Sequence, residues 1–177
     1  AALCANGETG RHPCRYREIT LTMKDNDQIL ALDNQICFAL YAANRAVTAR
    51  YRPLLEELGL TYPQYLVMLV MWEADREGLR PRVGDLGARL RLDSGTLTPL
   101  LKRLEQRELL QRARLAEDER VVRLRLTDAG RAMRAKAANV PGRLMCGLDI
   151  EPERLLSLRQ ELRSLLEVLE TAEPSER

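Results

Sequence analysis

Two short helical patterns separated by a tight polar break constrain the fold of this chain more than any other feature. The first covers residues 82–90, and its apolar side chains recur on one helical face. The break falls at 92–95, where Asp93 or Ser94 can cap a second helix with leucines on one face and mostly polar side chains on the other. Two short helices joined in this way predict a helix-turn-helix, although such hairpins also occur in proteins that never bind DNA.

A β-hairpin is expected directly after these helices. Residues 110–115 and 121–126 have the composition of strands, and they enclose a charged turn at 116–120. Apolar and basic residues alternate along the second strand, as they do in a strand with one exposed face. The hairpin would be the wing of a winged helix-turn-helix, so the sequence predicts a mainly α fold with a small β wing.

The residues before the helix-turn-helix are expected to form further helices. Apolar residues recur at three- and four-residue steps over 27–51 without Gly or Pro, which predicts one long amphipathic helix. Pro53 should kink this helix or start a second segment that Gly59 closes. Thr61 and Gln64 have the spacing of a capping box, which predicts the start of the next helix.

Two helices are expected after the wing. Thr127 should cap a helix that runs towards Gly147, with a bend at Pro141. The last helix, over 152–171, places five leucines at alternating three- and four-residue steps, which is the seam of a coiled coil. Packing within the chain can also bury such a seam, but we favour a homodimer interface because two-fold symmetry pairs two DNA half-sites.

These patterns divide the chain into four segments. We expect an irregular or disordered leader at 1–22, N-terminal helices for dimerisation, which include Cys37, at 23–58, the winged helix-turn-helix at 59–127 and C-terminal dimerisation helices at 128–177. If Met23 is the functional start, the leader residues with metal-binding or thiol chemistry have no role. These are Cys4, His12 and Cys14, and a small metal or thiol site among them is the disfavoured alternative.

Charge is distributed unevenly along the chain, although its net charge is only +2. Residues 76–125 contain 13 Lys and Arg against 8 Asp and Glu, whereas residues 149–177 contain 4 against 8. A basic centre suits a surface that meets phosphates, although a charge-rich helical face is often merely solvated. No apolar run approaches the length that spans a bilayer, so we expect a cytoplasmic protein without a membrane partner.

The four cysteines, at positions 4, 14, 37 and 146, do not have the spacing of a metal site. None forms a C-x-x-C pair, so we expect no metal and no other cofactor. Structural disulfides are disfavoured in the reducing compartment expected for this chain. The remaining roles are buried inert thiols or redox chemistry.

The N-terminal end of the second helix in the helix-turn-helix is the expected reading surface for DNA. Recognition helices enter the major groove with this end, where small side chains permit a close approach. The candidate contacts to bases and phosphates are Ser94, Gly95, Thr96, Thr98, Lys102 and Arg103. Arg120 at the wing tip could enter a minor groove, with Asp118 orienting its guanidinium group. For each arginine taken alone, a solvated surface charge is the simpler interpretation.

The string LDSGTLTPLLKRLE at 92–105, followed by Asp118-Glu119-Arg120, closely resembles the MarR family and, within it, the organic hydroperoxide resistance repressors. The resemblance extends from about Asp33 to the end of the last helix. It implies a dimeric winged-helix repressor, not an enzyme. Such a repressor releases its double-stranded operator DNA when organic hydroperoxides oxidise one cysteine near the N-terminus.

The resemblance also implies which residues carry the redox response. Cys37 matches the reactive cysteine, and Tyr41, Tyr51 and Tyr62 fall where the family places the tyrosines that surround it. Some members form an intersubunit disulfide with a second cysteine near the C-terminus. Cys146 lies in the corresponding helix of this chain.

The residues themselves permit a reactive thiol at Cys37. At ~100° per residue, Tyr41 and Tyr51 lie within about 40° of Cys37 if the helix is continuous. Phenol hydroxyls can donate hydrogen bonds to a thiolate, but a cysteine on an apolar helical stripe is also a common core filler. Two other functions stay open: a regulator that binds a phenolic or other small molecule non-covalently, and a thiol peroxidase, although the chain shows none of the peroxidase sequence motifs.

Overall fold

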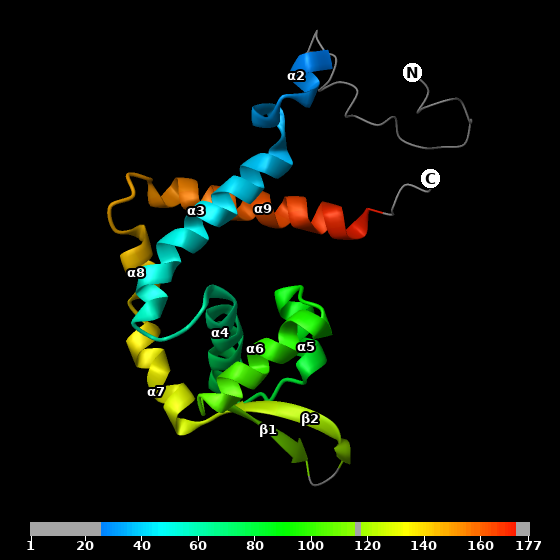
Figure 1. The fold of residues 1–177 in the computed structure, drawn as a ribbon, viewed down its shortest axis with the longest axis vertical. Coiled ribbons are helices and arrows are strands. Elements are labelled where there is room, and N and C mark those ends of the chain that lie inside the picture. The colour runs from blue at the N-terminus through cyan, green and yellow to red at the C-terminus, as the bar shows by residue number, and fades with distance from the viewer. Residues whose placement is uncertain (1–25, 116–117, 173–177) are drawn as a thin grey trace, which may run out of the picture.

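The computed structural model describes residues 26–115 and 118–172, which form a helical molecule with one antiparallel hairpin (Figure 1). The predicted leader, with Cys4, His12 and Cys14, lies outside the described residues. The elements follow in the order α2 (Asn26–Leu30), the 3-10 helix η1 (Leu32–Asn34), α3 (Ile36–Glu56), α4 (Tyr62–Arg76), α5 (Val83–Leu90), α6 (Ser94–Gln106), β1 (Leu110–Leu115), β2 (Asp118–Leu126), α7 (Asp128–Ala137), α8 (Val140–Met145) and α9 (Pro152–Thr171).

The expected fold class is confirmed, because α5 and α6 form the helix-turn-helix and β1 and β2 form the wing. Figure 1 shows α4, α5 and α6 gathered against the hairpin at one end, with α7 beside them, α3 and α9 at the other end, and α8 between the two groups. The hydrophobic core lies at the end that holds α4, α5, α6 and the hairpin. Its most deeply buried side chains include Met68, Met71, Leu86, Leu97, Leu101, Leu104, Leu110, Leu124 and Leu126.

The wing is anchored to the helix-turn-helix at its base. β1 and β2 pair in register from Leu110 opposite Leu126 outwards, and the register shifts after Arg114. The backbone N–H of Leu124 also donates to the carbonyl of Pro81 at 2.9 Å, so the chain entering α5 lines up beside β2. β2 begins three residues earlier than the predicted strand at 121–126, which shortens the connection between the strands.

The prediction of one continuous helix over 27–51 is wrong at its start. The chain forms α2 and η1, turns at Gln35 in an extended conformation, and begins α3 only at Ile36. Side-chain amides stabilise this corner, because Asn34 Nδ2 donates to the Gln28 carbonyl at 2.7 Å and Gln35 Nε2 to the Ile29 carbonyl at 2.6 Å. Such bonds give the backbone an alternative to the helix that apolar periodicity does not reveal.

Pro53 does not start a second segment, because α3 continues through it to Glu56. The expected end at Gly59 is confirmed: this residue has a left-handed φ of 63°, and the N–H of Leu60 donates back to the Leu55 carbonyl at 2.9 Å. The next helix starts as predicted, because Gln64 Oε1 accepts the backbone N–H of Thr61 at 2.9 Å.

The predicted helix from Asp128 towards Gly147 is two helices, α7 and α8, and the break lies before Pro141 rather than at it. Proline lacks a backbone N–H and is therefore tolerated in the first turn of a helix, and Pro141 is the second residue of α8. Thr127 caps α7 as expected, accepting the N–H of Gly130 at 3.0 Å. Helix α9 has the predicted bounds. None of the helices in the described part of the chain is long and apolar enough to cross a membrane.

Gly130 is the residue whose substitution should disturb this fold most directly. A Cβ at this position would lie 2.0 Å from the Leu109 carbonyl oxygen, and the Gly130 carbonyl accepts Trp72 Nε1 at 2.8 Å. We expect Gly130→Ala to lower the free energy of unfolding by about 2–3 kcal/mol, measured by urea denaturation. Gly142→Ala is the matched control, since nothing lies within 4 Å of its added Cβ. Equal stability of the two variants would contradict this packing.

Candidate functional site

The N-terminus of α6 is shaped by Asp93, its capping residue. One carboxylate oxygen of Asp93 accepts the backbone N–H of Thr96 and the other accepts its hydroxyl, both at 2.8 Å. These hydrogen bonds lower the pKa of Asp93 below its ordinary value, so the cap stays ionised. The cap fixes the first turn of α6 and holds the Thr96 hydroxyl in a defined direction.

The predicted DNA contacts on α6 are all exposed. Leu97, Leu101 and Leu104 are at most 1% exposed, which fixes the rotation of the helix about its own axis. This rotation leaves Gly95, Thr96, Thr98, Lys102 and Arg103 exposed, and Ser94 is exposed as the first residue of the helix. The side chains of Asp118 and Arg120, at the wing tip, lie outside those that the structure describes.

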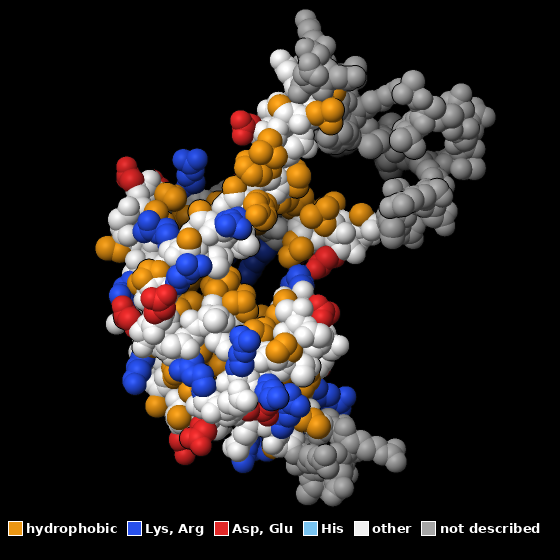
Figure 2. All heavy atoms as spheres, viewed as in Figure 1, with side chains coloured by type: hydrophobic (Ala, Val, Ile, Leu, Met, Phe, Trp, Pro, Cys, Tyr) orange, Lys and Arg blue, Asp and Glu red, His pale blue; other side chains and the backbone are white. Residues whose placement is uncertain are grey.

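Two further arginines of the helix-turn-helix and wing were not singled out from the sequence. Arg123 Nη1 donates to the Arg80 carbonyl at 2.8 Å, and Arg91, in the turn between α5 and α6, forms a forked pair with Glu170 of α9. Figure 2 shows Lys and Arg side chains gathered over the end of the molecule that holds the helix-turn-helix. The excess of Lys and Arg over residues 76–125 predicted a basic surface, but it could not show which of these residues form it.

The two described cysteines are both free and exposed. Cys37 is the second residue of α3, and Cys146 caps the C-terminal end of α8. Arg50 Nη2 lies 3.3 Å from the Cys146 carbonyl oxygen, which places Cys146 beside the C-terminal half of α3. Thirteen residues separate Arg50 from Cys37, or about 20 Å of helix, so the two cysteines of one chain are too far apart for a disulfide.

The candidate tyrosines fall into two groups. Tyr41 is 57% exposed one turn after Cys37, and its hydroxyl accepts Arg45 Nη1 at 3.2 Å. Tyr51 and Tyr62 instead pack together, with ring centroids 4.8 Å apart. Tyr51 lies fourteen residues, about 21 Å, along α3 from Cys37. The structure therefore brings neither Tyr51 nor Tyr62 to the thiol of its own chain.

Tyr65 joins the second group, and the sequence analysis missed it. Its ring centroid lies 5.8 Å from that of Tyr51, and the three-residue step from Tyr62 was the available signal. Burial, together with the neighbouring Tyr65 and Tyr62, raises the pKa of Tyr51 to about 12. Burial also raises the pKa of Tyr62 and of Tyr65. These three phenols therefore keep their protons, and remain hydrogen-bond donors, at neutral pH.

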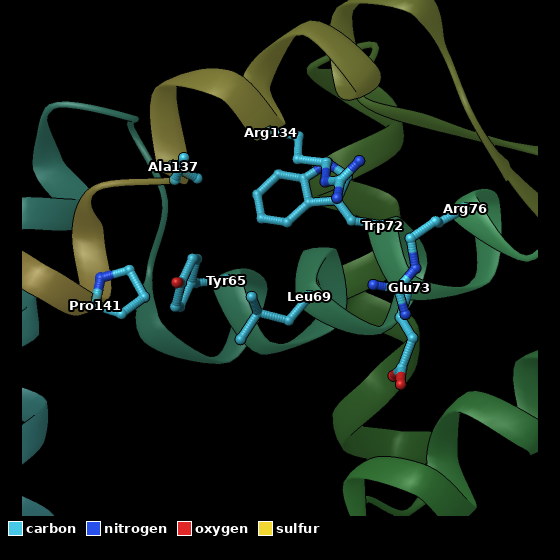
Figure 3. Close-up of a pocket in the computed structure, with 9 residues that line it drawn as sticks. Tyr65, Leu69, Trp72, Glu73, Arg76, Arg134, Ala137 and Pro141 are labelled. Atoms are coloured by element: carbon cyan, nitrogen blue, oxygen red, sulfur yellow. The ribbon is translucent and has the colours of Figure 1, made fainter. Parts of the chain in front are cut away.

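A cavity of about 480 Å³ lies between α4 and the α7–α8 break (Figure 3). Figure 3 shows Arg134 beside the ring of Trp72, with Tyr65 and Pro141 at the other end of the cavity. The remaining lining residues are Leu69, Glu73, Arg76, Ala137 and Ala138. The described residues contain no cluster of three or more His, Cys, Asp or Glu that could hold a metal ion.

The known proteins that this chain resembles are transcriptional regulators. Residues 49–136 match the family described as transcriptional regulator SarA/Rot. The organic hydroperoxide resistance transcriptional regulator of Bacillus subtilis is 43% identical over 147 residues, which cover 83% of this chain and 97% of that protein. The HTH-type transcriptional regulator TtmR of Methylorubrum extorquens is 46% identical, with coverage of 84% and 77%.

Solved structures of AbfR, a protein of Staphylococcus epidermidis, are also similar. Reduced AbfR bound to DNA has a TM-score of 0.68 and 33% identity, and the match covers 81% of this chain and 97% of that one. The disulfide-formed state of AbfR has a TM-score of 0.54 and 32% identity, with coverage of 86% and 99%.

The raised pKa of Tyr51 gives a prediction for alkaline pH. A phenol whose pKa is about 12 in the folded protein and near its ordinary 10.0 when unfolded stabilises the fold fully below pH 10.0, and this stabilisation is lost as the pH rises towards 12. Tyr51→Phe cannot ionise, so the difference in free energy of unfolding between parent and variant should fall across this range. Denaturant unfolding at several pH values measures it, and a constant difference would contradict the burial of the Tyr51 hydroxyl.

Proposed function

The chain belongs to the MarR-type family of winged-helix transcriptional regulators, together with the organic hydroperoxide resistance regulators, and from this membership we propose that it is a repressor controlled by oxidation of Cys37. Its relatives are DNA-binding regulators rather than enzymes, so the thiol peroxidase alternative finds no support.

The DNA surface of the proposed repressor is the exposed face of α6. Its N-terminal turn offers small side chains at Ser94, Gly95 and Thr96, which allow the backbone to approach the major groove. Lys102 and Arg103 lie further along the same exposed face, where phosphates and guanine edges are within reach. Arg120 and Asp118 at the wing tip complete the proposed contacts, with the arginine in the minor groove.

A homodimer is supported by apolar surface that one chain leaves uncovered. Helix α9 buries none of its residues, and Leu158, Leu162 and Leu169 are 49%, 40% and 63% exposed. Figure 2 shows further hydrophobic side chains where α3 and α9 lie, and Ile36 of α3 is 68% exposed. Apolar patches of this extent mark an interface. We therefore assign dimerisation to 23–58 and 128–177, on either side of the winged helix-turn-helix at 59–127.

The observation that carries the redox proposal is the position of Cys146 beside Arg50, at the same level of α3 as Tyr51. If two α3 helices cross in antiparallel fashion, the N-terminal end of one meets residues near 50 of the other. That single arrangement brings Cys37 close to both the tyrosine group and Cys146 of the partner subunit. The distance of about 20 Å that excludes an intrachain disulfide thus favours an intersubunit one.

The start of α3 suits a reactive thiol. Cys37 lies in the first turn of a 21-residue helix that has no acidic residue in that turn. The thiolate is the nucleophilic form of a cysteine, and the exposed Cys37 side chain is open to an approaching peroxide. Tyrosine hydroxyls that stay protonated can donate hydrogen bonds to this thiolate, while their rings leave an apolar approach for an alkyl peroxide.

The proposed chemistry has two steps. The Cys37 thiolate attacks the terminal oxygen of an organic hydroperoxide, the O–O bond breaks, and the alkoxide takes up a proton and leaves as an alcohol. The thiol of the partner's Cys146 then attacks the Cys37 sulfenic acid, so that an S–S bond forms and water leaves. Two thiols are oxidised and one peroxide is reduced. The new bond changes the separation of the two recognition helices, which then no longer matches the spacing of the two DNA half-sites, and the operator is released.

One observation favours a second candidate, a regulator of the same type that binds an aromatic acid. The cavity of about 480 Å³ has an indole wall at Trp72 and guanidinium groups at Arg76 and Arg134. Such a lining suits a phenolic carboxylate. Release of the operator by this ligand, in a protein whose DNA binding does not respond to peroxide, would select this candidate.

The cysteine proposal is tested by treating the operator-bound protein with cumene hydroperoxide. We expect the parent to release DNA and to run as a covalent dimer in non-reducing electrophoresis. Cys37→Ser should keep its operator and remain a monomer, because it lacks the thiolate that attacks the peroxide. Cys146→Ser should form no covalent dimer and should keep most of its operator affinity after peroxide treatment, because in this proposal the disulfide drives release. Release of Cys37→Ser as readily as the parent would show that the sensing residue lies elsewhere.

The DNA surface is tested by the salt dependence of operator binding. Lys102→Ala should weaken binding by roughly threefold to tenfold and reduce the slope of log affinity against log salt by about 1, because one phosphate contact is lost. Lys136→Ala is the matched control: it removes the same charge from an exposed position on α7, outside the helix-turn-helix. An equal effect of both variants would indicate a general charge effect rather than a contact at Lys102.

A further inference from the structure

Two arginines from distant elements hold the α3–α4 turn, defined here as residues 57–60. Arg143 of α8 forms a forked ion pair with Glu57, with both N···O distances at 2.6 Å. Arg107, at the C-terminal end of α6, donates to the Leu58 carbonyl at 2.9 Å and to the Gly59 carbonyl. The turn that ends the cysteine-bearing helix is therefore tied to the Cys146 region on one side and to the recognition helix on the other.

We propose that the α3–α4 turn is the relay through which a disulfide at Cys146 changes the position of the recognition helix. The inference rests on the proposed redox function and adds the residues that transmit it. Glu57, Arg143 and Arg107 act as positioning residues, because none of them touches the peroxide or the reacting sulfur atoms.

Few residues separate Cys146 from the ion pair that starts the relay. Arg143 lies three residues before Cys146, and Arg50 holds the carbonyls of Leu144 and Cys146 at 3.4 and 3.3 Å. A disulfide confines Cys146 to the geometry of the bond, so the end of α8 must follow its new partner. A forked pair resists rotation as well as separation, so Arg143 carries such a shift to Glu57. Hydrogen bonds from Arg143 also hold the pKa of Glu57 below its ordinary value, which keeps the pair charged.

The turn itself is too confined to absorb a shift. Leu58 and Leu60 are buried in the core, and Gly59 has a left-handed conformation against which Arg107 packs closely. A Cβ at Gly59 would lie 2.8 Å from Arg107 Nη2. A displacement of Glu57 is thus passed to the neighbouring carbonyls rather than dissipated in a flexible loop.

The output side reaches the DNA surface through a rigid helix. Arg107 donates to carbonyls beyond the end of α3, where a helix end leaves acceptors without backbone partners. It immediately follows the 13-residue α6, whose other end carries Ser94 and Thr96. A small rotation at the Arg107 end therefore displaces the N-terminal turn of α6, which lies about 20 Å away. That turn is the part of the helix that reads the major groove in the proposed complex.

A charge-swap cycle tests the input side of the relay. Glu57→Arg, Arg143→Glu and the double variant are compared with the parent for operator affinity before and after cumene hydroperoxide. Disulfide formation is followed in each by non-reducing electrophoresis. Each single variant should form the covalent dimer as completely as the parent. Its loss of operator affinity on oxidation should nevertheless be about threefold to tenfold smaller than that of the parent. The double variant should recover most of the parental loss, because the pair is restored with its charges exchanged.

Arg107→Gln tests the output side and should reduce the oxidation-induced loss of affinity in the same way. Arg112→Gln is its matched control, since it removes an arginine paired with Glu105 of α6 at 3.2 Å that makes no bond to the turn. Thermal unfolding of all variants checks that they fold. If a charge reversal prevents folding, Glu57→Gln and Arg143→Gln replace it, because neutral side chains of similar size break the pair without repulsion.

The relay is overturned if the single variants and Arg107→Gln release DNA on oxidation as fully as the parent, or if the double variant does not recover. Failure of the redox function has a different signature. In that case the parent itself forms no covalent dimer or keeps its operator after peroxide treatment, and no variant is needed to see it.

Discussion

The buried leucine face of α6 is the constraint on which the DNA surface depends. Leu97, Leu101 and Leu104 are packed under the helix with almost no exposure, so the rotation of α6 is fixed by the hydrophobic effect rather than by any contact with DNA. Once that face is inside, Thr98 and Lys102 can only point outwards. The proposed reading surface is therefore preorganised in the isolated chain, and its position can change only if the whole helix moves with its packing partners.

Local chemistry explains which parts of the fold the sequence could predict. The cap at Asp93, the helix end at Gly59 and the bounds of α9 depend on neighbours within one or two turns, and each was predictable. The corner before Ile36 was not, because two side-chain amides there bond to the backbone and outweigh an apolar periodicity that continues through it. The break before Pro141 was placed too late for a related reason, since proline fits the first turn of a new helix.

The sequence proposes the members of the candidate site but does not give their arrangement. Helical angle correctly placed Tyr41 and Tyr51 on the side of Cys37, but an angle contains no information about the rise along the helix axis, which separates Tyr51 from the thiol by about 21 Å. The ion pair between Glu57 and Arg143 joins residues 86 positions apart, and no local pattern reports such a contact. Sequence periodicity thus identifies faces, whereas distances between functional groups require the folded chain.

The same distance gives the proposed dimer a role beyond covering apolar surface. A single chain holds a thiol at one end of α3 and the tyrosine group and second cysteine at the other, so neither end alone is a complete redox site. An antiparallel pairing of α3 helices would complete two such sites at once, related by the two-fold axis. Oxidation would then act on the contact that sets the separation of the two recognition helices. In this arrangement a sensor would need no separate domain, because the interface that spaces the DNA-binding units would also be where the peroxide reacts.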